Sequence, residues 1–418
     1  MADSAPERAM THDMGAAVRA GAVETTIAII TRDRKDELRR AVRSALDQTG
    51  SVEVLVIDDG SIDGTSEMLR RDFPEVRVVR FEDDADVAAR RNDAAALASG
   101  EVIVSIDDDA VFSSPRIVAD TLRDLDHPRI AGVAIPFVDV GISPEIQQQA
   151  PDREGSWVTT IFRATAYAIR RDVLVEVGGY TREIGQFGEE FDLSLKLLDS
   201  GYVIRLGRSA PIHHHTSVRR NYRRMGILYR RNEQLICWMY FPFPWNFLYM
   251  GGYALRGIRT GVTTGQLPTM AEGVAAGLRW CMTGRVRRRP ISRAAFRFDR
   301  RSRARARAGG AMRLAEADAA LGPLSPSPQL AALQRPRAIR VLHLRLRQAR
   351  TRTIATIGRP IHCEVCGAVL FRGLPFIWRG RLKLLGAESL PVRVDWDKMN
   401  RMTFRHVELD HCQAPWAS

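Results

Sequence analysis

From about residue 25 to residue 107, the chain alternates between short apolar runs and segments whose apolar residues recur three or four positions apart. Uninterrupted apolar runs are typical of buried strands, and the wider spacing is typical of amphipathic helices. Strands are predicted at residues 26–30, 52–57, 76–81 and 102–106, and helices at residues 38–48, around Met68 and Leu69, and at residues 87–97. This alternation indicates an α/β fold with a mostly parallel sheet covered by helices on both faces.

Beyond residue 107 the pattern predicts fewer strands and more helix. The predicted elements are extended segments at residues 131–138, 159–169 and 202–206, a helix at residues 189–199, and a helical, aromatic and arginine-rich region at residues 222–307. Residues 322–328 have linker composition, with three prolines among seven residues. The predicted organisation is a flexible N-terminus at residues 1–23, a core domain at 24–220, a helical extension at 221–308, a linker at 309–328, and a small C-terminal module at 329–418.

The net charge of +13 is unevenly distributed along the chain. Residues 285–307 contain eleven arginines and a single acidic residue, Asp299. Residues 235–255 contain no charged residue and are rich in aromatic side chains, but Pro242 and Pro244 disfavour a membrane-spanning helix. We therefore expect the extension to rest on an anionic membrane surface. An ordinary buried helix–turn–helix is the alternative.

The first residues and the cysteines indicate a reducing compartment. Residues 1–22 carry charged side chains and no apolar stretch, so no signal peptide is predicted. Five cysteines in a chain of 418 residues do not form a disulfide framework. Cys237 and Cys281 are expected to be buried apolar residues. The expected location is the cytoplasm, with the protein peripheral on the inner face of the plasma membrane.

Three consecutive carboxylates, Asp107, Asp108 and Asp109, stand at the exit of the strand at residues 102–106. Like charges crowded in this way repel one another unless a cation compensates them. Hard oxygen ligands suit Mg²⁺ or Mn²⁺, which often bridge protein carboxylates to substrate phosphates. Ligands of parallel sheets bind beyond the carboxyl ends of the strands, where Asp58 and Asp59 also fall. The sequence therefore predicts a metal and phosphate site at this edge of the sheet.

Four motifs occur in a meaningful order in the core domain. They are Thr31-Arg32-Asp33-Arg34 after the first strand, Asp58-Asp59-Gly60-Ser61 after the second, Arg91-Asn92 before the fourth, and Asp107-Asp108-Asp109 after it. In this order they resemble the family 2 glycosyltransferases, inverting enzymes of the GT-A fold that use nucleotide sugars. The resemblance covers about residues 25–217 and continues more weakly to about residue 301. Ala94 is a departure, because relatives often have glycine at that position.

The resemblance implies a set of donor-binding residues. They are Thr31, Arg34, Asp58, Asp59, Gly60, Ser61, Arg91, Asn92, Asp107 and Asp108. Within this set, Asp58 would accept a hydrogen bond from the base, Arg34 would suit a phosphate, and Asp107 would face the ribose. Asp109 would ligate the divalent cation that stabilises the diphosphate leaving group. From the residues alone, turn formation for residues 58–61 and a helix start for residues 31–34 remain alternatives.

The segment Gly188-Glu189-Glu190-Phe191-Asp192-Leu193 resembles the acidic helix start of the family. The resemblance implies that Glu190 is the base, although aspartate is commoner at that position. An inverting transfer needs one carboxylate to take the proton of the attacking hydroxyl. Glu189 is the rival base, and Asp192 is expected to hold the helix start or an acceptor hydroxyl. Compensation of the helix dipole is the alternative for all three acids.

Three adjacent histidines follow the predicted strand at residues 202–206. The resemblance implies a histidine near the diphosphate and the metal, and a neutral imidazole can ligate Mn²⁺. Side chains alternate along an extended segment, so His213 and His215 would face one side and His214 the other. The metal-ligand prediction is therefore Asp109 with His213 or His214, and a structural histidine is the alternative.

The C-terminal module offers one cysteine pair, Cys363 and Cys366, at a spacing suited to Zn²⁺. The other half of a zinc site would have to come from Cys412 with His406 or His411. A structural zinc ion in this module is one interpretation, and free thiols or a redox pair are the alternatives.

Together these features favour an inverting transfer of a sugar from a UDP-, GDP- or dTDP-sugar to an acceptor hydroxyl, assisted by Mg²⁺ or Mn²⁺. By analogy, the acceptor is expected to be a saccharide or a lipid-linked molecule of cell-envelope polysaccharide or glycolipid synthesis. A sugar-nucleotide pyrophosphorylase would need a glycine-rich nucleotide loop after residue 30, and the sequence has none there. A nucleic-acid-binding protein with a zinc knuckle would use residues 285–307 but leaves the ordered acidic motifs unexplained, so nucleic acid is not expected as a partner.

Overall fold

The computed structural model describes residues 24–82, 85–216 and 221–324 in full, together with a two-residue strand at residues 9–10 and strands between residues 342 and 409. The chain divides into two compact units, Ala2–Ser325 and Pro326–Ser418. All candidate residues of the predicted core domain lie in the first of these units.

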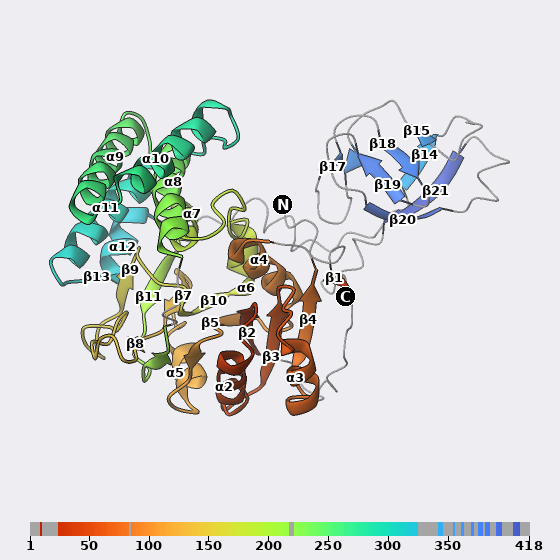
Figure 1. Ribbon diagram of the computed structural model, residues 1–418, viewed down its shortest axis with the longest axis horizontal. Helices are drawn as coiled ribbons and strands as arrows, with labels where there is room; N and C mark the ends of the chain where they lie inside the picture. The colour runs from red at the N-terminus through yellow and green to blue at the C-terminus, as the bar shows by residue number, and fades with distance from the viewer. Residues whose placement is uncertain are drawn as a thin grey trace. The chain divides into compact units, whose positions relative to one another are not determined.

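In the described part of the first unit, ten strands form one mixed sheet (Figure 1). One half is parallel and consists of β2 (Thr25–Thr31), β3 (Val52–Asp58), β4 (Arg77–Phe81) and β5 (Val102–Asp107), in the order β4-β3-β2-β5. The order continues from β5 through β10 (Ala166–Arg170), β7 (Ile130–Ala134), β11 (Val203–Leu206), β9 (Trp157–Thr159) and β13 (Met312–Arg313), and β1 (Ala9–Met10) pairs with β4 at the other edge. The parallel strands β2, β3 and β5 therefore end side by side, as the sequence predicts.

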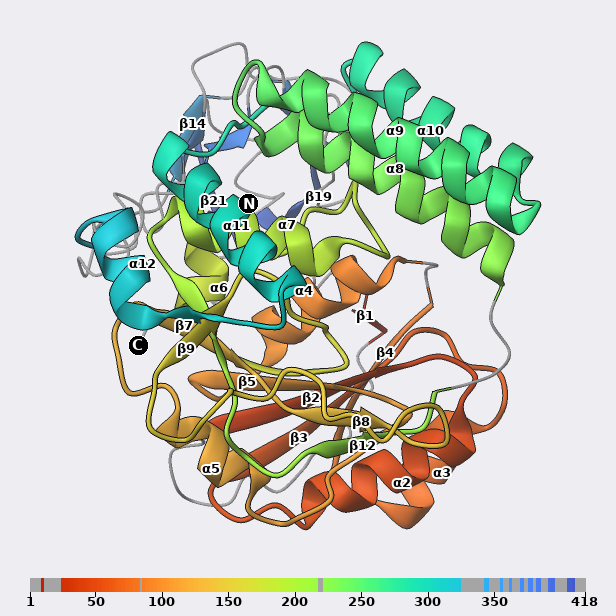
Figure 2. The same cartoon turned by 90° about the vertical axis from the view of Figure 1, so that its left-hand side faces the viewer.

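Helices cover both faces of this sheet (Figure 2). One face carries α2 (Lys35–Leu46), α3 (Thr65–Asp72) and α5 (Ile117–Arg123), and the other carries α4 (Val87–Leu97), α6 (Arg171–Glu176) and α7 (Glu189–Asp199). Side chains alternate along β2, so Ile27 and Ile29 pack in the same core as Leu38 of α2, whereas Ala28 packs in the core of Ala88 of α4. Burial of both strand faces explains the continuous apolar runs, and the α/β prediction is confirmed.

A small second sheet lies at the end of β5. It consists of β6 (Ala110–Val111), β12 (Ile212–His214) and β8 (Phe137–Asp139), with β12 in the middle. Its register pairs His214 with Ala110 on one side and with Asp139 on the other. Three segments that are distant in the sequence are therefore brought together directly after the acidic residues of β5.

Five helices follow residue 221 in the described part of the chain. They are α8 (Tyr222–Tyr240), α9 (Trp245–Thr264), α10 (Leu267–Met282), α11 (Arg293–Arg307) and α12 (Leu314–Leu321). A third apolar core joins α7, α8 and α11 through Leu195, Leu235 and Phe296. The predicted helical character of residues 222–307 is confirmed. None of the described helices is both long and apolar enough to cross a membrane.

The predicted extended segment at residues 159–169 is interrupted in the structure. β9 ends at Thr159 and β10 begins at Ala166, and the residues between them form a loop. Phe162 and Ala164 of this loop are buried in the same core as α4 and α7. Their apolar character therefore reflects burial in a loop, which the hydrophobic pattern alone does not distinguish from a strand.

The segment predicted as a linker at residues 309–328 contains regular structure. β13 pairs with β9, and Ala317 of α12 is buried in the third core. Arg129 donates hydrogen bonds to the carboxylate of Asp318 at 2.6 Å and to the carbonyl of Gly322. These long-range contacts order a segment whose composition is typical of a linker.

The unit Pro326–Ser418 contains antiparallel strands among its described residues. One sheet has the order β14 (Leu342–Arg345), β21 (Phe404–Leu409), β20 (Leu390–Val394), β19 (Arg381–Leu384), β18 (Pro375–Trp378) and β15 (Ile354–Ala355), and β16 (Ile361–His362) pairs with β17 (Val369–Phe371). His406 lies in β21. The other candidate zinc ligands, Cys363, Cys366, His411 and Cys412, lie outside the described residues, so the zinc site stays a prediction.

Candidate functional site

The acidic residues after β5 lie against the segment that follows β2. Asp108 is buried and accepts hydrogen bonds from the hydroxyl of Thr31 and from Arg34 Nη1, each at 2.9 Å. The same nitrogen of Arg34 donates to Asp109 Oδ2 at 2.9 Å. Burial raises the pKa of Asp108 to about 7, with Arg34 opposing this shift and the charge of Asp109 adding to it. The sequence predicts Arg34 at a phosphate, and in this structure its guanidinium pairs with Asp108 and Asp109.

Asp107, Asp109 and His214 form a potential metal site within the described residues. Each offers one ligand atom, and these atoms lie within 4.8 Å of one another. His214 Nε2 is 3.2 Å from Asp109 Oδ1. Burial would raise the pKa of Asp109, but His214 and Arg34 hold it below its usual range. Two carboxylates and an imidazole are a donor set that suits Mn²⁺, so the residues present fit a divalent cation.

The register of β12 distinguishes between the two predicted metal histidines. His214 is buried and faces the acidic cluster, whereas His213 is exposed on the opposite side of the strand. This is the alternation expected of an extended segment. The structure therefore brings His214 to Asp107 and Asp109 and leaves His213 outside the group.

Asp139 is a site residue that the sequence analysis does not single out. Its Oδ1 is 2.5 Å from His214 Nδ1, the ring nitrogen that points away from Asp109. Burial would lower the pKa of His214, but the carboxylates of Asp109 and Asp139 raise it. A carboxylate on one ring nitrogen fixes the orientation in which the other is presented to a ligand. No local signal identifies Asp139, because it reaches His214 only through the pairing of β8 with β12.

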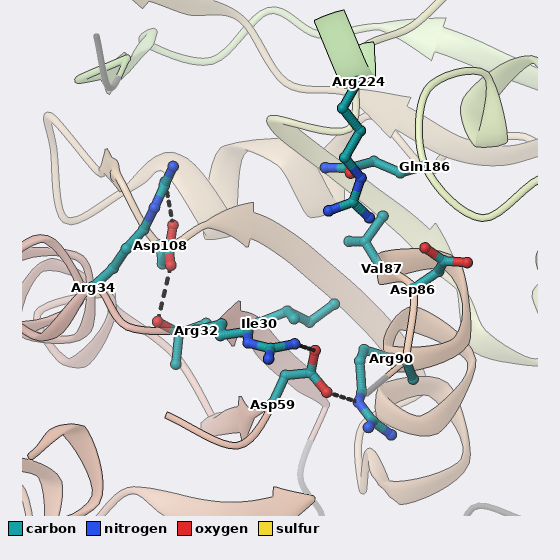
Figure 3. Close-up of a pocket in the computed structure, with 12 residues that line it drawn as sticks. Ile30, Arg32, Arg34, Asp59, Asp86, Val87, Arg90, Asp108, Gln186 and Arg224 are labelled. Carbon is teal, nitrogen blue, oxygen red and sulfur yellow. Dashed lines mark hydrogen bonds and ion pairs between the residues drawn. The ribbon is translucent and has the colours of Figure 1, made fainter. Parts of the chain in front are cut away.

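A pocket of about 400 Å³ opens beside the acidic cluster (Figure 3). It is lined by residues of the predicted donor set and by residues that the sequence analysis missed. The predicted ones are Thr31, Arg34, Asp59 and Asp108, and the others include Arg32, Asp86, Arg90, Gln186 and Arg224. In Figure 3, Arg224 reaches toward the pocket from α8, on the side opposite Asp59. Arg32 stood within a predicted motif, but nothing in the sequence around Arg224 indicates its place at the pocket.

The two aspartates at the end of β3 have different surroundings. Asp58 is fully buried and does not line the pocket. Its donors are the N–H of Ser61 at 2.9 Å, the hydroxyl of Ser66 at 2.6 Å and Arg80 Nη1 at 2.9 Å. Asp59 lines the pocket and accepts from Arg90 Nε at 2.5 Å, and Gly60 turns the chain beyond it with a φ of +73°. The sequence predicts that Asp58 contacts the base, but in this structure Asp59, and not Asp58, lies in the wall of the pocket.

Arg91 and Asn92 lie behind the pocket rather than in its wall. Arg91 is buried, donates to Glu189 Oε1 at 2.8 Å and lies 3.7 Å from Asp107 Oδ1. Asn92 exchanges two hydrogen bonds with the backbone of Tyr180, at 2.9 and 2.8 Å. The sequence predicts both as donor-binding residues, and in the structure they hold α4 against neighbouring segments.

The three acids at the start of α7 are not equivalent. Asp192 is fully buried, and its donors are the N–H of Thr181 at 2.9 Å, Lys196 Nζ at 3.0 Å and the hydroxyl of Tyr240. Burial raises the pKa of Glu189 to about 8, and Glu190 adds to this shift while Arg91 opposes it. Glu190 is partly exposed and accepts from the N–H of Ala164 at 3.3 Å. Among the three predicted catalytic acids, Glu190 is therefore the accessible one.

The arginine-rich residues 285–307 are partly used inside the protein. The guanidinium of Arg303 lies 3.5 Å from the ring centre of Phe191 in α7. Arg288 donates to the carbonyl of Phe241 at 3.0 Å. These contacts connect α11 and the segment before it to the core, so the number of arginines overstates the charge that is available to a polyanion.

Comparison with known proteins finds similarities in the core domain. Residues 26–180 match the model of the family described as Glycosyl transferase family 2. The succinoglycan biosynthesis protein ExoU of Rhizobium meliloti (strain 1021) is 36% identical over 201 residues, which cover 44% of this chain and 59% of that protein. The O-antigen biosynthesis protein RfbC of Myxococcus xanthus is 25% identical over 228 residues, which cover 48% of this chain and 18% of that protein. The chain thus spans less than two thirds of either relative.

Among solved structures, the mannosyltransferase PcManGT from Pyrobaculum calidifontis in complex with GDP-Man and Mn²⁺ is 18% identical, with 68% of this chain and 81% of that chain covered and a TM-score of 0.43. S. aureus TarS in complex with UDP-GlcNAc is 17% identical, with 51% of this chain and 65% of that chain covered and a TM-score of 0.44. Both likenesses are partial.

Proposed function

Because the chain carries a glycosyltransferase family 2 domain, we propose that it transfers a sugar from a nucleotide-sugar donor to an acceptor hydroxyl, with inversion at the anomeric carbon. One observation carries this proposal. The candidate metal ligands Asp107, Asp109 and His214 lie at the same sheet edge as a pocket whose wall contains Asp59 and several arginines. Anionic metal ligands beside guanidinium groups are an arrangement suited to a diphosphate.

The pocket wall suggests how a UDP-, GDP- or dTDP-sugar would be held. The guanidinium groups of Arg32 and Arg224 face the pocket and suit phosphate oxygens. Asp59 lines the pocket and would accept a hydrogen bond from the base or the ribose, in the role that the sequence analysis gives to Asp58. In this structure its oxygens pair with Arg90 and Arg32. Thr31 and Arg34 act through Asp108, which they hold in place.

Asp107, Asp109 and His214 would hold Mg²⁺ or Mn²⁺. When bound, the ion supplies positive charge that stabilises the diphosphate as a leaving group. The two oxygens of Asp109 are already divided between two neighbours, since Oδ2 accepts from Arg34 and Oδ1 faces His214. Asp139 keeps the ring of His214 in the orientation that points Nε2 to this site.

Glu190 is the proposed base that takes the proton of the acceptor hydroxyl. Its carboxylate is partly exposed, and its charge acts on Asp107. Glu189 is buried against Arg91, and Asp192 is saturated by its three donors. Neither of these two acids offers a free oxygen at the surface of the site, which supports Glu190 over its rival Glu189.

The acceptor is proposed to be a saccharide or a lipid-linked molecule of polysaccharide or glycolipid synthesis, at the inner face of the plasma membrane in the cytoplasm. The names of the two relatives, which refer to succinoglycan and O-antigen biosynthesis, support this choice. The nucleic-acid alternative is weakened because arginines such as Arg288 and Arg303 make contacts inside the protein. No observation favours the pyrophosphorylase alternative, and the family match covers residues 26–180.

The first experiment is calorimetric titration of the purified full-length protein with UDP, GDP and dTDP, each with and without Mn²⁺. We expect binding of one nucleotide that depends on the metal. Asp109→Asn should lose the metal dependence, and His213→Asn, at the exposed neighbouring histidine, should retain it. Absence of binding for all three nucleotides in the presence of Mn²⁺ would refute the proposed donor class.

A second experiment tests the base. Glu190→Gln should bind the nucleotide as the wild type does but slow transfer by about 10² to 10⁴. Turnover is measured as release of the nucleotide from its sugar, with water as a surrogate acceptor when the natural one is absent. If Glu190→Gln retains wild-type turnover, Glu190 has no role as a base.

A further inference from the structure

The outward face of α9 is apolar although it lies in solvent. Five of its large apolar side chains are between 46% and 69% exposed, namely Phe247, Leu248, Leu255, Ile258 and Val262. We call these five residues the α9 stripe. Steps of seven residues separate Leu248, Leu255 and Val262, which places them on one side of a helix with 3.6 residues per turn. The buried residues Asn246, Met250, Gly257 and Gly261 occupy the other side.

The α9 stripe is part of a larger apolar surface. Phe243 before α9 is 73% exposed and lies 6.4 Å from the ring of Phe247. Met282 at the end of α10 is 81% exposed. In Figure 1, α9 lies at the outer edge of the first unit. Exposed apolar side chains gathered on one face of a helix mark a site of interaction.

The surroundings of the stripe are basic. Residues 241–289 contain seven arginines and one acidic residue, Glu272, which pairs with Arg223 at 2.6 Å. Arg256 and Arg259 of α9 are both exposed. Arg256 also pairs with Glu233 of α8, and Arg288 is used inside the protein. A groove of about 300 Å³ beside the stripe is lined by Leu248, Tyr249, Gly252, Tyr253, Arg256 and Arg307. The surface thus combines apolar side chains that can be buried with cations that attract anionic groups.

We propose that the α9 stripe docks on an anionic lipid bilayer, with its apolar side chains at the headgroup level and the arginines against lipid phosphates. A helix with apolar side chains on one exposed face and flanking arginines lies in the plane of such an interface. A second copy of the chain fits less well, because two such faces would bring their arginines together. The acids that neighbour these arginines, Glu233 and Glu272, are already paired with arginines of the same chain. The docking does not depend on the proposed sugar transfer.

The orientation of the bundle relates this surface to the pocket. Arg224 lines the pocket from the first turn of α8, and the adjacent Arg223 pairs with Glu272 in the first part of α10. Gly261 near the end of α9 is in close contact with Leu267 at the start of α10. The C-terminal end of the stripe therefore lies at the same end of the bundle of α8, α9 and α10 as the pocket. Docking of the stripe would bring the pocket close to the lipid surface.

The test is flotation of the full-length protein with vesicles of phosphatidylcholine alone or with about a third phosphatidylglycerol. We expect binding to the anionic vesicles that weakens in high salt, and weaker binding to the neutral ones. The double variant Leu255→Glu, Val262→Glu should reduce the partition coefficient more than about tenfold. The matched control is Ile142→Glu, which places the same charge at another apolar residue that is 66% exposed and should bind as the wild type does.

Three outcomes would overturn the proposal. They are absence of binding to anionic vesicles, equal binding of the double variant and the wild type, and conversion of a wild-type dimer to a monomer by the double variant in light scattering. The last outcome would assign the stripe to a second copy of the chain. Metal-dependent nucleotide binding, measured on the same preparations, should be unchanged in the double variant. A failure of docking is thereby distinguished from a failure of the proposed function.

Discussion

Replacing Glu189 by glutamine should change how the stability of the protein depends on pH. Burial raises the pKa of the Glu189 carboxyl from 4.5 to about 8. Between these two pH values the folded protein holds a proton on Glu189 that the unfolded chain has released, so the folded state is progressively destabilised as pH rises from 4.5 to 8. Glu189→Gln carries no titratable group at this position and escapes that loss.

The size of this change in stability follows from the part of the range from pH 4.5 to pH 8 that can be measured. Between pH 6 and pH 9 about two pH units lie below the folded pKa, and each is worth about 1.4 kcal/mol, so the variant should gain about 3 kcal/mol relative to the wild type. For a unit of this size the gain corresponds to about 6 °C in the difference between the two melting temperatures. At pH 6 Glu189 is protonated in the wild type, so Arg91 faces a neutral group there in both proteins. The attraction that Arg91 exerts on the ionised carboxylate at higher pH is already included in the pKa of about 8.

The assay is thermal unfolding of the full-length wild type and variant at pH 6, 7, 8 and 9 in one buffer system. Glu53→Gln is the control, because hydrogen bonds from Thr26, Ser99 and Arg77 outweigh burial and lower the pKa of Glu53. The stabilisation that Glu53 gains from its lowered pKa is fully present above the pKa of this carboxyl in the unfolded chain. The difference in melting temperature between the wild type and Glu53→Gln should therefore be constant from pH 6 to pH 9. A constant difference for Glu189→Gln as well would mean that Arg91 keeps Glu189 ionised throughout, and the reasoning would fail.

Three further predictions concern packing and the metal site. Gly132→Ala should destabilise the protein by about 3 kcal/mol, because the added Cβ would lie 2.3 Å from the carbonyl oxygen of Ala168 in β10. Gly251→Ala, with open space around the new Cβ, should instead stabilise the protein by about 1 kcal/mol. Both variants are measured by chemical denaturation, and equal changes in the free energy of unfolding would contradict the packing argument. Tyr240→Phe removes one donor of the buried carboxylate of Asp192 and should cost about 2 kcal/mol, measured by denaturant midpoint, where an unchanged midpoint would show that the hydroxyl is dispensable. Asp139→Asn should weaken Mn²⁺ binding by about 10- to 100-fold in a calorimetric titration, whereas wild-type affinity would show that His214 is oriented by other groups.

The sequence predicted the elements that depend on local pattern. The helix at residues 189–199 agrees with α7 to the residue, and β2, β3 and β5 agree within one residue at each end. The acidic motifs could be placed at one edge because parallel strands end together. A buried strand and an amphipathic helix each impose their own spacing of apolar residues, and a sequence carries that spacing without reference to the rest of the chain.

Composition was a weaker guide where long-range contacts decide the structure. The supposed linker at residues 309–328 contains β13 and α12, which are held by pairing with β9 and by Arg129. Residues 235–255 are divided between two environments, because Leu235 is buried in a core while Leu248 and Leu255 of α9 are exposed. Whether an apolar side chain is buried depends on which elements pack against its helix, and the chain's own pattern does not contain that information.

Within the candidate site, the sequence alone determined which types of side chain are available, and the tertiary structure determined which of them lie together. The sequence identifies the carboxylates at the end of β5 and the histidines after β11 as candidate metal ligands. The register of β12 then places His214, and not His213, beside these carboxylates, and it places Asp139 beside His214. The hydrogen bonds that hold Asp58 away from the pocket, and the place of the buried Asp59 in the pocket wall, likewise follow from how a loop closes against β4. The physical reason is that a side chain's type is local, whereas its direction and its partners are set by strand pairing between segments far apart in the chain.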